Sequence, residues 1–313
     1  MSKRRTFRFF AVLTILLLIC CAGAATAESI EPFRLPLMQL HHVGLGSANC
    51  HLLIAGDTVI LIDGGTDTDT FQKPDRMLAY VASSGIDHID AHFVTHYHND
   101  HAMQIDDFSR DYGRDSTVVY GPSAELNYRF LPLPNGTYRQ LLLGDELDVG
   151  PFHVLCTGPR TVDAEGRTNH DSLNLLFTYG QIRILFTGDY AGGQLKEEPI
   201  ASRTADVDIL IFPHHGLEPF TVGPLTLRHL NPALVLVPGA SYGGVYNYFD
   251  QNYMAPLIRC SGNGNLVVLS DGVSWQLYEN VAPGAFSAMT GAEDTYPDPE
   301  SIPTEEPPEE STP

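Results

Sequence analysis

The chain has 313 residues, with 18 Lys and Arg against 38 Asp and Glu, and its formal net charge is −20. Hydrophobic residues make up 43% and charged residues 18%, which excludes a mainly disordered or collagen-like chain and is enough to fill a substantial core. So acidic a surface also excludes a sequence-independent clamp on nucleic acid, because such clamps bind phosphates through clustered Lys and Arg. We expect one large domain.

Residues 1–27 have the pattern of a secretory signal peptide. A basic segment is followed by an apolar run over Phe9–Ile19 and by the small-residue cleavage pattern Ala25-Thr26-Ala27. The leader carries four cations and no anion, so the remaining residues 28–313 have 14 Lys and Arg against 38 Asp and Glu, a net charge of −24. We predict a secreted, extracytoplasmic protein without a stable membrane span. An uncleaved anchor over Phe9–Ala25, which is borderline in length for spanning, is the alternative.

The expected folded domain covers residues 28–291 and is rich in short β-branched runs between turn residues. The two expected helices lie at 73–83, where the apolar spacing is helical, and at 254–260. The predicted strands lie at 50–55, 58–63, 91–96, 116–121, 173–179, 182–188, 208–213, 233–239, 265–270 and 274–279. This order predicts an α/β fold with two sheets and helices outside them.

The composition changes abruptly at residues 292–313, which hold eight acidic residues, six prolines and one aliphatic side chain, Ile302. Such a segment buries too little apolar surface to offset the entropy of ordering, so we predict a disordered acidic tail.

Three cysteines remain after the leader: Cys50, Cys156 and Cys260. They are too far apart for a sequence-local zinc knuckle. An odd number permits one disulfide and a spare thiol, or three thiols that behave as small apolar side chains. We favour buried thiols, and the sequence does not decide a pairing.

The densest cluster of chemically active side chains follows the predicted strand at 91–96. His96, His98, Asp100 and His101 form an H-x-H-x-D-H pattern on the loop that leaves this strand. Three imidazoles and a carboxylate within six residues offer nitrogen and oxygen donors at a spacing that suits two adjacent divalent ions. The pattern therefore predicts a metal site.

Two later apolar strands end in residues of the same kind. Asp189 follows one of them, and His214 and His215 follow the other. A carboxylate at the end of a buried strand destabilises the fold unless a cation lies beside it. We therefore add these residues to the candidate site.

In this arrangement the chain resembles the metallo-β-lactamase fold hydrolases over about residues 40–278. The motifs, in one consistent order, are LIDGG (61–65), THYHNDH (95–101), NHDSLNLLF (169–177), FTGD (186–189) and PHHG (213–216). The N-x-x-S, TGD and HHG elements look closest to the hydrolase domain of the DNA-uptake protein ComEC and to secreted phosphodiesterases of that branch. The resemblance implies an αββα sandwich in a single domain, with a two-metal site that usually holds Zn²⁺; Mn²⁺ is the alternative.

The resemblance also assigns the ligands. It implies that His96 and His98 bind one ion, that Asp100 and His101 bind the other, and that Asp189 bridges the two. Asp100 and Asp189 would be the carboxylates that act in catalysis.

Other assignments from the resemblance depart from the family pattern or stay open. His214 would complete the second metal site, and His215 is the alternative. The histidine of this pair that is not a ligand would support the site from behind. Many members take a third histidine for the first metal from a Gly-His motif that this chain lacks. His170 or Asn169 occupies the corresponding stretch; we favour His170 as the ligand, with Asn169 in a supporting contact, and the sequence does not decide between them. Asp63 in LIDGG would hold the metal loop by hydrogen bonds, as carboxylates behind metal ligands do.

The expected activity is hydrolysis, because two adjacent cations acidify a water and neutralise charge that develops on an attacked phosphoryl or carbonyl oxygen. The ComEC-like motifs favour a phosphodiester that is small or single-stranded, with weak binding of nucleic acid in general. One alternative is a lactone, thioester or β-lactam hydrolase on the same fold. The other is a secreted binding protein that keeps its metal without turnover and uses the tyrosine-rich stretch 242–249 as a contact surface.

Overall fold

The computed structural model describes residues 35–46, 48–65, 75–125, 133–159, 162, 166, 168–190, 204–218, 222–239, 243–262, 264–286 and 296–305. These residues belong to one compact unit that begins at Leu35. The predicted signal peptide lies outside the described residues. No helix in the described part of the chain is long and apolar enough to cross a membrane.

The first sheet has eight strands in the order β15-β14-β1-β2-β3-β4-β5-β6. From β15 to β3 neighbouring strands are antiparallel, and from β3 to β6 they are parallel. The strands are β1 (Met38–His42), β2 (His51–Ala55), β3 (Thr58–Ile62), β4 (Ile89–Phe93), β5 (Gly113–Gly121), β6 (Thr137–Gln140), β14 (Leu266–Ser270) and β15 (Trp275–Tyr278).

The second sheet has seven strands in the order β13-β12-β11-β10-β9-β8-β7. Here the pairs from β10 to β13 are parallel and the others antiparallel. The strands are β7 (Glu146–Val149), β8 (Phe152–Gly158), β9 (Asn174–Tyr179), β10 (Ile182–Phe186), β11 (Ile209–Ile211), β12 (Leu234–Val237) and β13 (Leu257–Cys260).

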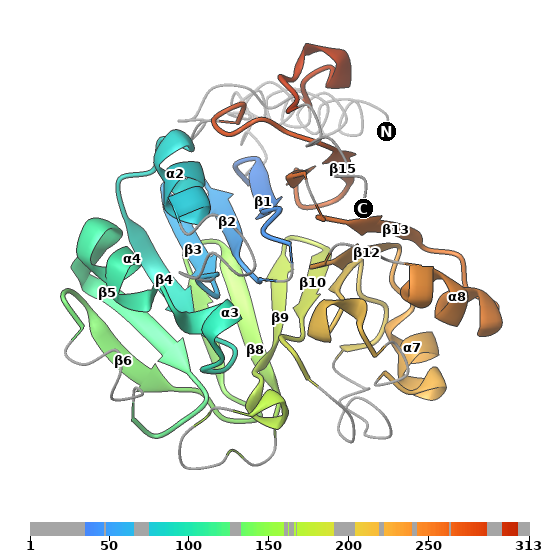
Figure 1. Cartoon of the computed structure of the whole chain (residues 1–313), viewed down its shortest axis with the longest axis horizontal. Coiled ribbons are helices and arrows are strands. Elements are labelled where there is room, and N and C mark those ends of the chain that lie inside the picture. Colours follow the sequence, from blue (N-terminus) through green and yellow to red (C-terminus); the bar gives the residue numbers. More distant parts are fainter. Residues whose placement is uncertain are drawn as a thin grey trace, which may run out of the picture. The chain divides into compact units, whose positions relative to one another are not determined.

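Helices cover the outer face of each sheet (Figure 1). The helices α2 (Asp75–Ser83) and α4 (Ile105–Tyr112) pack on the first sheet through Met77, Tyr80 and Phe108. The helices α7 (Pro224–Leu230) and α8 (Gly243–Gln251) pack on the second. The predicted αββα sandwich in a single domain is therefore confirmed.

The central strands are apolar on both faces because both faces are covered. In β2, Leu53 and Ala55 point into the core between the two sheets, whereas Leu52 and Ile54 point outward to the helices. For this reason the sequences of these strands are continuous apolar segments and do not alternate between apolar and polar residues.

The helix predicted at 254–260 is wrong. Residues Leu257–Cys260 form the edge strand β13, which pairs in parallel with β12. The helix in this region is α8, earlier in the chain, and its Val245 and Phe249 lie one turn apart and are both buried. Sheet hydrogen bonds to β12 override the weak local helical pattern, and the tyrosine-rich stretch packs as a helix over the second sheet.

The tail also differs from its prediction, because residues 296–305 pack back on the fold. Tyr278 Oη donates to Pro297 O at 2.9 Å, and an isolated bridge joins Val281 to Thr304. Tyr296 and Ile302 pack on the outer cluster of β14 and β15. Two apolar side chains and main-chain pairing are therefore enough to order this part of an otherwise acidic, proline-rich segment.

We expect this contact to stabilise the domain. A chain that ends at residue 295 should melt about 4–8 °C below one that ends at Glu305, because removing the half-buried Tyr296 and Ile302 costs about 2 kcal/mol. Calorimetry of the two truncated chains would measure the difference. Equal melting temperatures would show that residues 296–305 contribute no stability.

The three cysteines form no disulfide among the described residues. Cys50 and Cys156 are buried and Cys260 is partly buried. Burial raises the pKa of the Cys156 thiol to about 12, so this thiol stays protonated and unreactive at neutral pH.

Candidate metal centre

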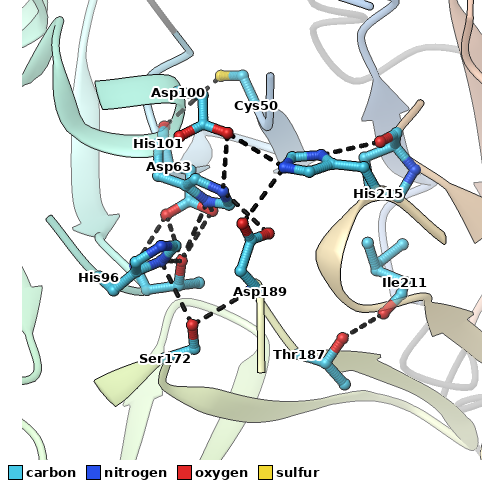
Figure 2. A network of polar contacts seen from close by, with 12 residues as sticks. Cys50, Asp63, His96, Asp100, His101, Ser172, Thr187, Asp189, Ile211 and His215 are labelled. Carbon is cyan, nitrogen blue, oxygen red and sulfur yellow. Dashed lines mark hydrogen bonds and ion pairs between the residues drawn. The ribbon is translucent and has the colours of Figure 1, made fainter. Parts of the chain in front are cut away.

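The candidate centre lies where strands of both sheets end. Asp63 follows β3, and the loop after β4 carries Thr95–His101 and runs into the short helix α3 (Asn99–Ala102). From the second sheet, Asp189 follows β10 and His215 follows β11 on the turn η3 (His214–Gly216). Figure 2 shows these side chains converging between the two sheets.

One group of four possible ligands consists of Asp100, His101, Asp189 and His215, whose ligand atoms all lie within 4.8 Å of one another. His101 Nε2 is 3.0 Å from Asp189 Oδ1, and His215 Nε2 is 3.1 Å from Asp100 Oδ2 and 3.3 Å from Asp189 Oδ2. Two carboxylates and two imidazoles are thus ready to surround one ion (Figure 2).

A second group contains His96, His98 and Asp189, again within 4.8 Å. The His96 ring lies 4.5 Å from the His98 ring and 4.2 Å from the His101 ring, between centroids. Asp189 is the residue that belongs to both groups.

The donor atoms suit a metal ion. His96 Nε2 is buried and has no hydrogen-bond partner, whereas the buried His101 Nε2 and Asp189 Oδ1 contact each other at 3.0 Å. Buried polar atoms are normally paired, and an ion bound among these donors would give His96 Nε2 the partner it lacks. Imidazole nitrogens with carboxylate oxygens are the donors that Zn²⁺ and Mn²⁺ take in proteins.

Asp63 holds the metal loop from behind. It accepts hydrogen bonds from the Thr95 backbone N–H at 2.8 Å, from Thr95 Oγ1 at 2.9 Å and from His101 Nδ1 at 2.8 Å. The bond to Nδ1 leaves His101 Nε2 free to face the site. Such a contact fixes both the orientation and the tautomer of a ligating imidazole.

The charges of the ligand groups are strongly coupled. Burial disfavours charge on His215, but attraction to Asp189 and hydrogen bonds to Asp100 and Asp189 outweigh it and raise the His215 pKa to about 9. Burial works against ionisation of Asp100 too, yet the hydrogen bond from His215 and the charge on His101 lower the Asp100 pKa to about 2. A metal ion must displace the proton that the His215 imidazole holds, so the affinity of the site for metal falls as the pH is lowered.

The structure places His215, and not His214, among the ligands, which corrects the preferred assignment. The His215 side chain is 4% exposed and is held by its contact of 3.0 Å between Nδ1 and Pro238 O. Both histidines have left-handed backbone angles, with φ of 51° and 54°. This turn sends the two rings in different directions, and His214 Nε2 instead lies 3.3 Å from the Asn169 amide nitrogen.

His170 does not join either ligand group, and its side chain is exposed on the short turn η2 (Asn169–Asp171). Its assignment to the first metal therefore has no support in the geometry. The turn is held by a capping box between Thr168 and Asp171, which leaves His170 on the outside.

Ser172 is a supporting residue that the sequence interpretation missed. Its Oγ lies 3.3 Å from His96 Nδ1 and accepts the Asp189 N–H at 3.1 Å, so it links the two ligand groups (Figure 2). The N-x-x-S element before β9 is the sequence signal that could have identified it.

Several solved structures of low sequence identity are similar to this chain. The metallo-beta-lactamase fold protein YhfI from Bacillus subtilis has 14% identity and a TM-score of 0.53, with 77% of this chain and 99% of that chain covered. CmlA, a diiron beta-hydroxylase from Streptomyces venezuelae, has 17% identity and a TM-score of 0.43, with 69% and 47% covered. Yeast PDE1 has 12% identity and a TM-score of 0.46, with 72% and 97% covered. None of the curated proteins compared with the chain matches it significantly.

A family model provides the assignment. Residues 43–239 match the model of the Metallo-beta-lactamase superfamily, and this range contains all the candidate ligands described above. The chain therefore belongs to the metallo-beta-lactamase superfamily, a superfamily of metal-dependent hydrolases.

Proposed function

We propose that this protein is an exported hydrolase with two divalent metal ions and that it acts on a phosphodiester. The observation that carries the proposal is the sharing of Asp189 by two adjacent ligand groups, which suits a pair of ions rather than one. The N-x-x-S, TGD and HHG elements, which resemble the ComEC-like branch, favour a phosphodiester over a carbonyl substrate.

When bound here, the ions would supply Lewis-acid stabilisation of negative charge and a more acidic water, and Zn²⁺ and Mn²⁺ both suit that role. The protein's own residues fix the geometry. Asp189 belongs to both ligand groups, Asp63 orients His101, and Ser172 contacts His96. Asp100, the most exposed of the four carboxylates and imidazoles in its group, lies on the side that solvent reaches.

The charge of the chain favours a small or single-stranded substrate. With 14 Lys and Arg against 38 Asp and Glu in residues 28–313, the protein repels long polyanions, so we expect nucleic acid to bind weakly and without sequence preference. The leader pattern supports an extracytoplasmic location, where such a substrate would be met.

Metal analysis followed by a hydrolysis screen tests the proposal. The purified protein should bind close to two zinc ions and cleave bis(p-nitrophenyl) phosphate faster than a lactone or a β-lactam. Asp148→Ala, at an exposed carboxylate outside the centre, is the matched control for His98→Ala, which should lose activity. Efficient cleavage of lactones or β-lactams without any cleavage of phosphodiesters would refute the substrate assignment and leave only the hydrolase assignment.

A further inference from the structure

The two ligand groups of the centre are unequal. Asp100, His101, Asp189 and His215 form a group of four, whereas His96, His98 and Asp189 form a group of three. Zn²⁺ usually has four ligands, of which water can be one, so the group of three has room for one more donor, such as an oxygen that is not from a carboxylate.

Asn169 offers such an oxygen. Its Oδ1 is buried and has no hydrogen-bond partner, as is also true of His96 Nε2. A buried carboxamide oxygen without a partner in the protein is uncommon, and a role as a ligand of an ion is one of the few physical explanations.

The position of Asn169 ties it to the first group. It opens the turn η2, and its carbonyl oxygen accepts the Ser172 N–H at 3.3 Å. Ser172 Oγ in turn contacts His96 and Asp189. The Asn169 side chain therefore comes from the turn that supports the ligands of the first group.

His214 fixes the orientation of this amide. Asn169 Nδ2 donates to His214 Nε2 at 3.3 Å, so Oδ1 is the end of the amide that remains available. The His214 backbone N–H donates to Gly188 O at 3.2 Å, directly before Asp189 in the chain. His214 has a left-handed backbone with φ of 51°, a conformation that a non-glycine residue keeps only where its surroundings require it.

We propose that Asn169 Oδ1 is a ligand of the first metal ion, beside His96, His98 and Asp189, and that His214 is the residue that positions it. The inference rests on the two-metal centre of the proposed function but not on the substrate. The first site then has two imidazole nitrogens and two oxygens, and a carboxamide binds Zn²⁺ less tightly than an imidazole does.

Zinc binding by single variants tests the ligand. Affinities of both sites would be measured by competition with a chromophoric chelator, on protein freed of metal. Asn169→Ala should weaken one site at least tenfold and leave the other unchanged, Asn169→Asp should restore binding, and Asn169→His should bind more tightly than the natural residue. His170→Ala, the exposed neighbour on the same turn, is the matched control and should bind both ions as the unaltered protein does.

The positioning role of His214 is tested by separate variants. His214→Ala should weaken the same site about 10–100-fold, as loss of an orienting contact does, and His214→Gln should restore part of the affinity. The visible absorption spectrum of the Co²⁺-substituted protein should change in Asn169→Ala and His214→Ala but not in His170→Ala, because it reports the ligands around the ion.

Two results would overturn the inference. One is an Asn169→Ala variant that binds two ions with unchanged affinity. The other is a loss in His170→Ala equal to that in Asn169→Ala. If Asn169→Ala does not fold by circular dichroism, Asn169→His decides the question. Tighter binding of one ion than in the unaltered protein supports the ligand role, and unchanged affinity for both ions contradicts it. A protein that binds zinc as expected here but cleaves no phosphodiester would refute the proposed substrate alone.

Discussion

Replacing Asp189 with alanine is expected to lower kcat about a thousandfold or more, which corresponds to about 4 kcal/mol of lost transition-state stabilisation. Asp189 is the residue shared by both ligand groups, and its side chain is 3% exposed between His101 and His215. Without it, two imidazoles face each other without the carboxylate that attracts them, and neither ion keeps its full set of ligands. Steady-state kinetics and metal analysis on the same preparation would measure both effects.

Two further variants make this result specific. Asp189→Asn keeps the shape of the side chain but removes its charge, so it should retain the fold and lose most of the activity. Asp148→Ala removes an exposed carboxylate from β7 and should leave activity and metal content unchanged. An Asp189→Ala protein that keeps two ions and at least a tenth of the activity would contradict the bridging role.

Acidification is expected to destabilise the fold steeply between pH 6.5 and pH 4. His41, His42 and His92 are buried, and burial lowers their pKa values to about 3, about 4 and about 4. The unfolded chain, with ordinary histidine pKa values of about 6.5, binds more protons than the native state in this range. The stability these residues contribute is therefore complete above pH 6.5 and is lost as the pH falls. Three such groups give a slope of about 4 kcal/mol per pH unit near pH 5.

His41 allows the contribution of one histidine to be isolated. Its Nδ1 lies 2.6 Å from Tyr80 Oη and its Nε2 lies 2.9 Å from Gln39 Oε1, so a neutral ring on β1 is fully hydrogen-bonded and belongs to neither ligand group. His41→Gln should reduce the slope by one proton, about 1.4 kcal/mol per pH unit. Urea unfolding of metal-free protein at several pH values would measure it. An unchanged slope would mean that His41 titrates in the native state.

Much of the architecture could be predicted from local sequence because the central strands are continuous apolar runs between turn residues. The strands β2, β3, β9, β10 and β14 coincide with predicted runs. The edge strands β6 and β7 were not predicted, since each alternates between exposed and half-buried residues and has little apolar pattern. Their pairing depends on the neighbouring strand rather than on their own composition.

Near the C-terminus the decisive contacts are also distant in sequence. The helix at 254–260 and the wholly disordered tail were both inferred from composition within a short window. Leu257–Cys260 became a strand because β12 offers a free edge, and residues 296–305 became ordered because β14 and β15 present an apolar surface to Tyr296 and Ile302.

By itself, the sequence determined the parts of the centre that lie within one loop. His96, His98, Asp100 and His101 are fixed by their spacing on a single turn after a strand, so no distant residue is needed to group them. Only the tertiary structure decided what comes from other strands: that His215 rather than His214 turns inward, that His170 stays outside, and that Asn169 and Ser172 flank the ligands. These outcomes depend on backbone angles and on contacts between the two sheets, where a rotation of one residue exchanges the buried ring of His215 for the partly exposed ring of His214.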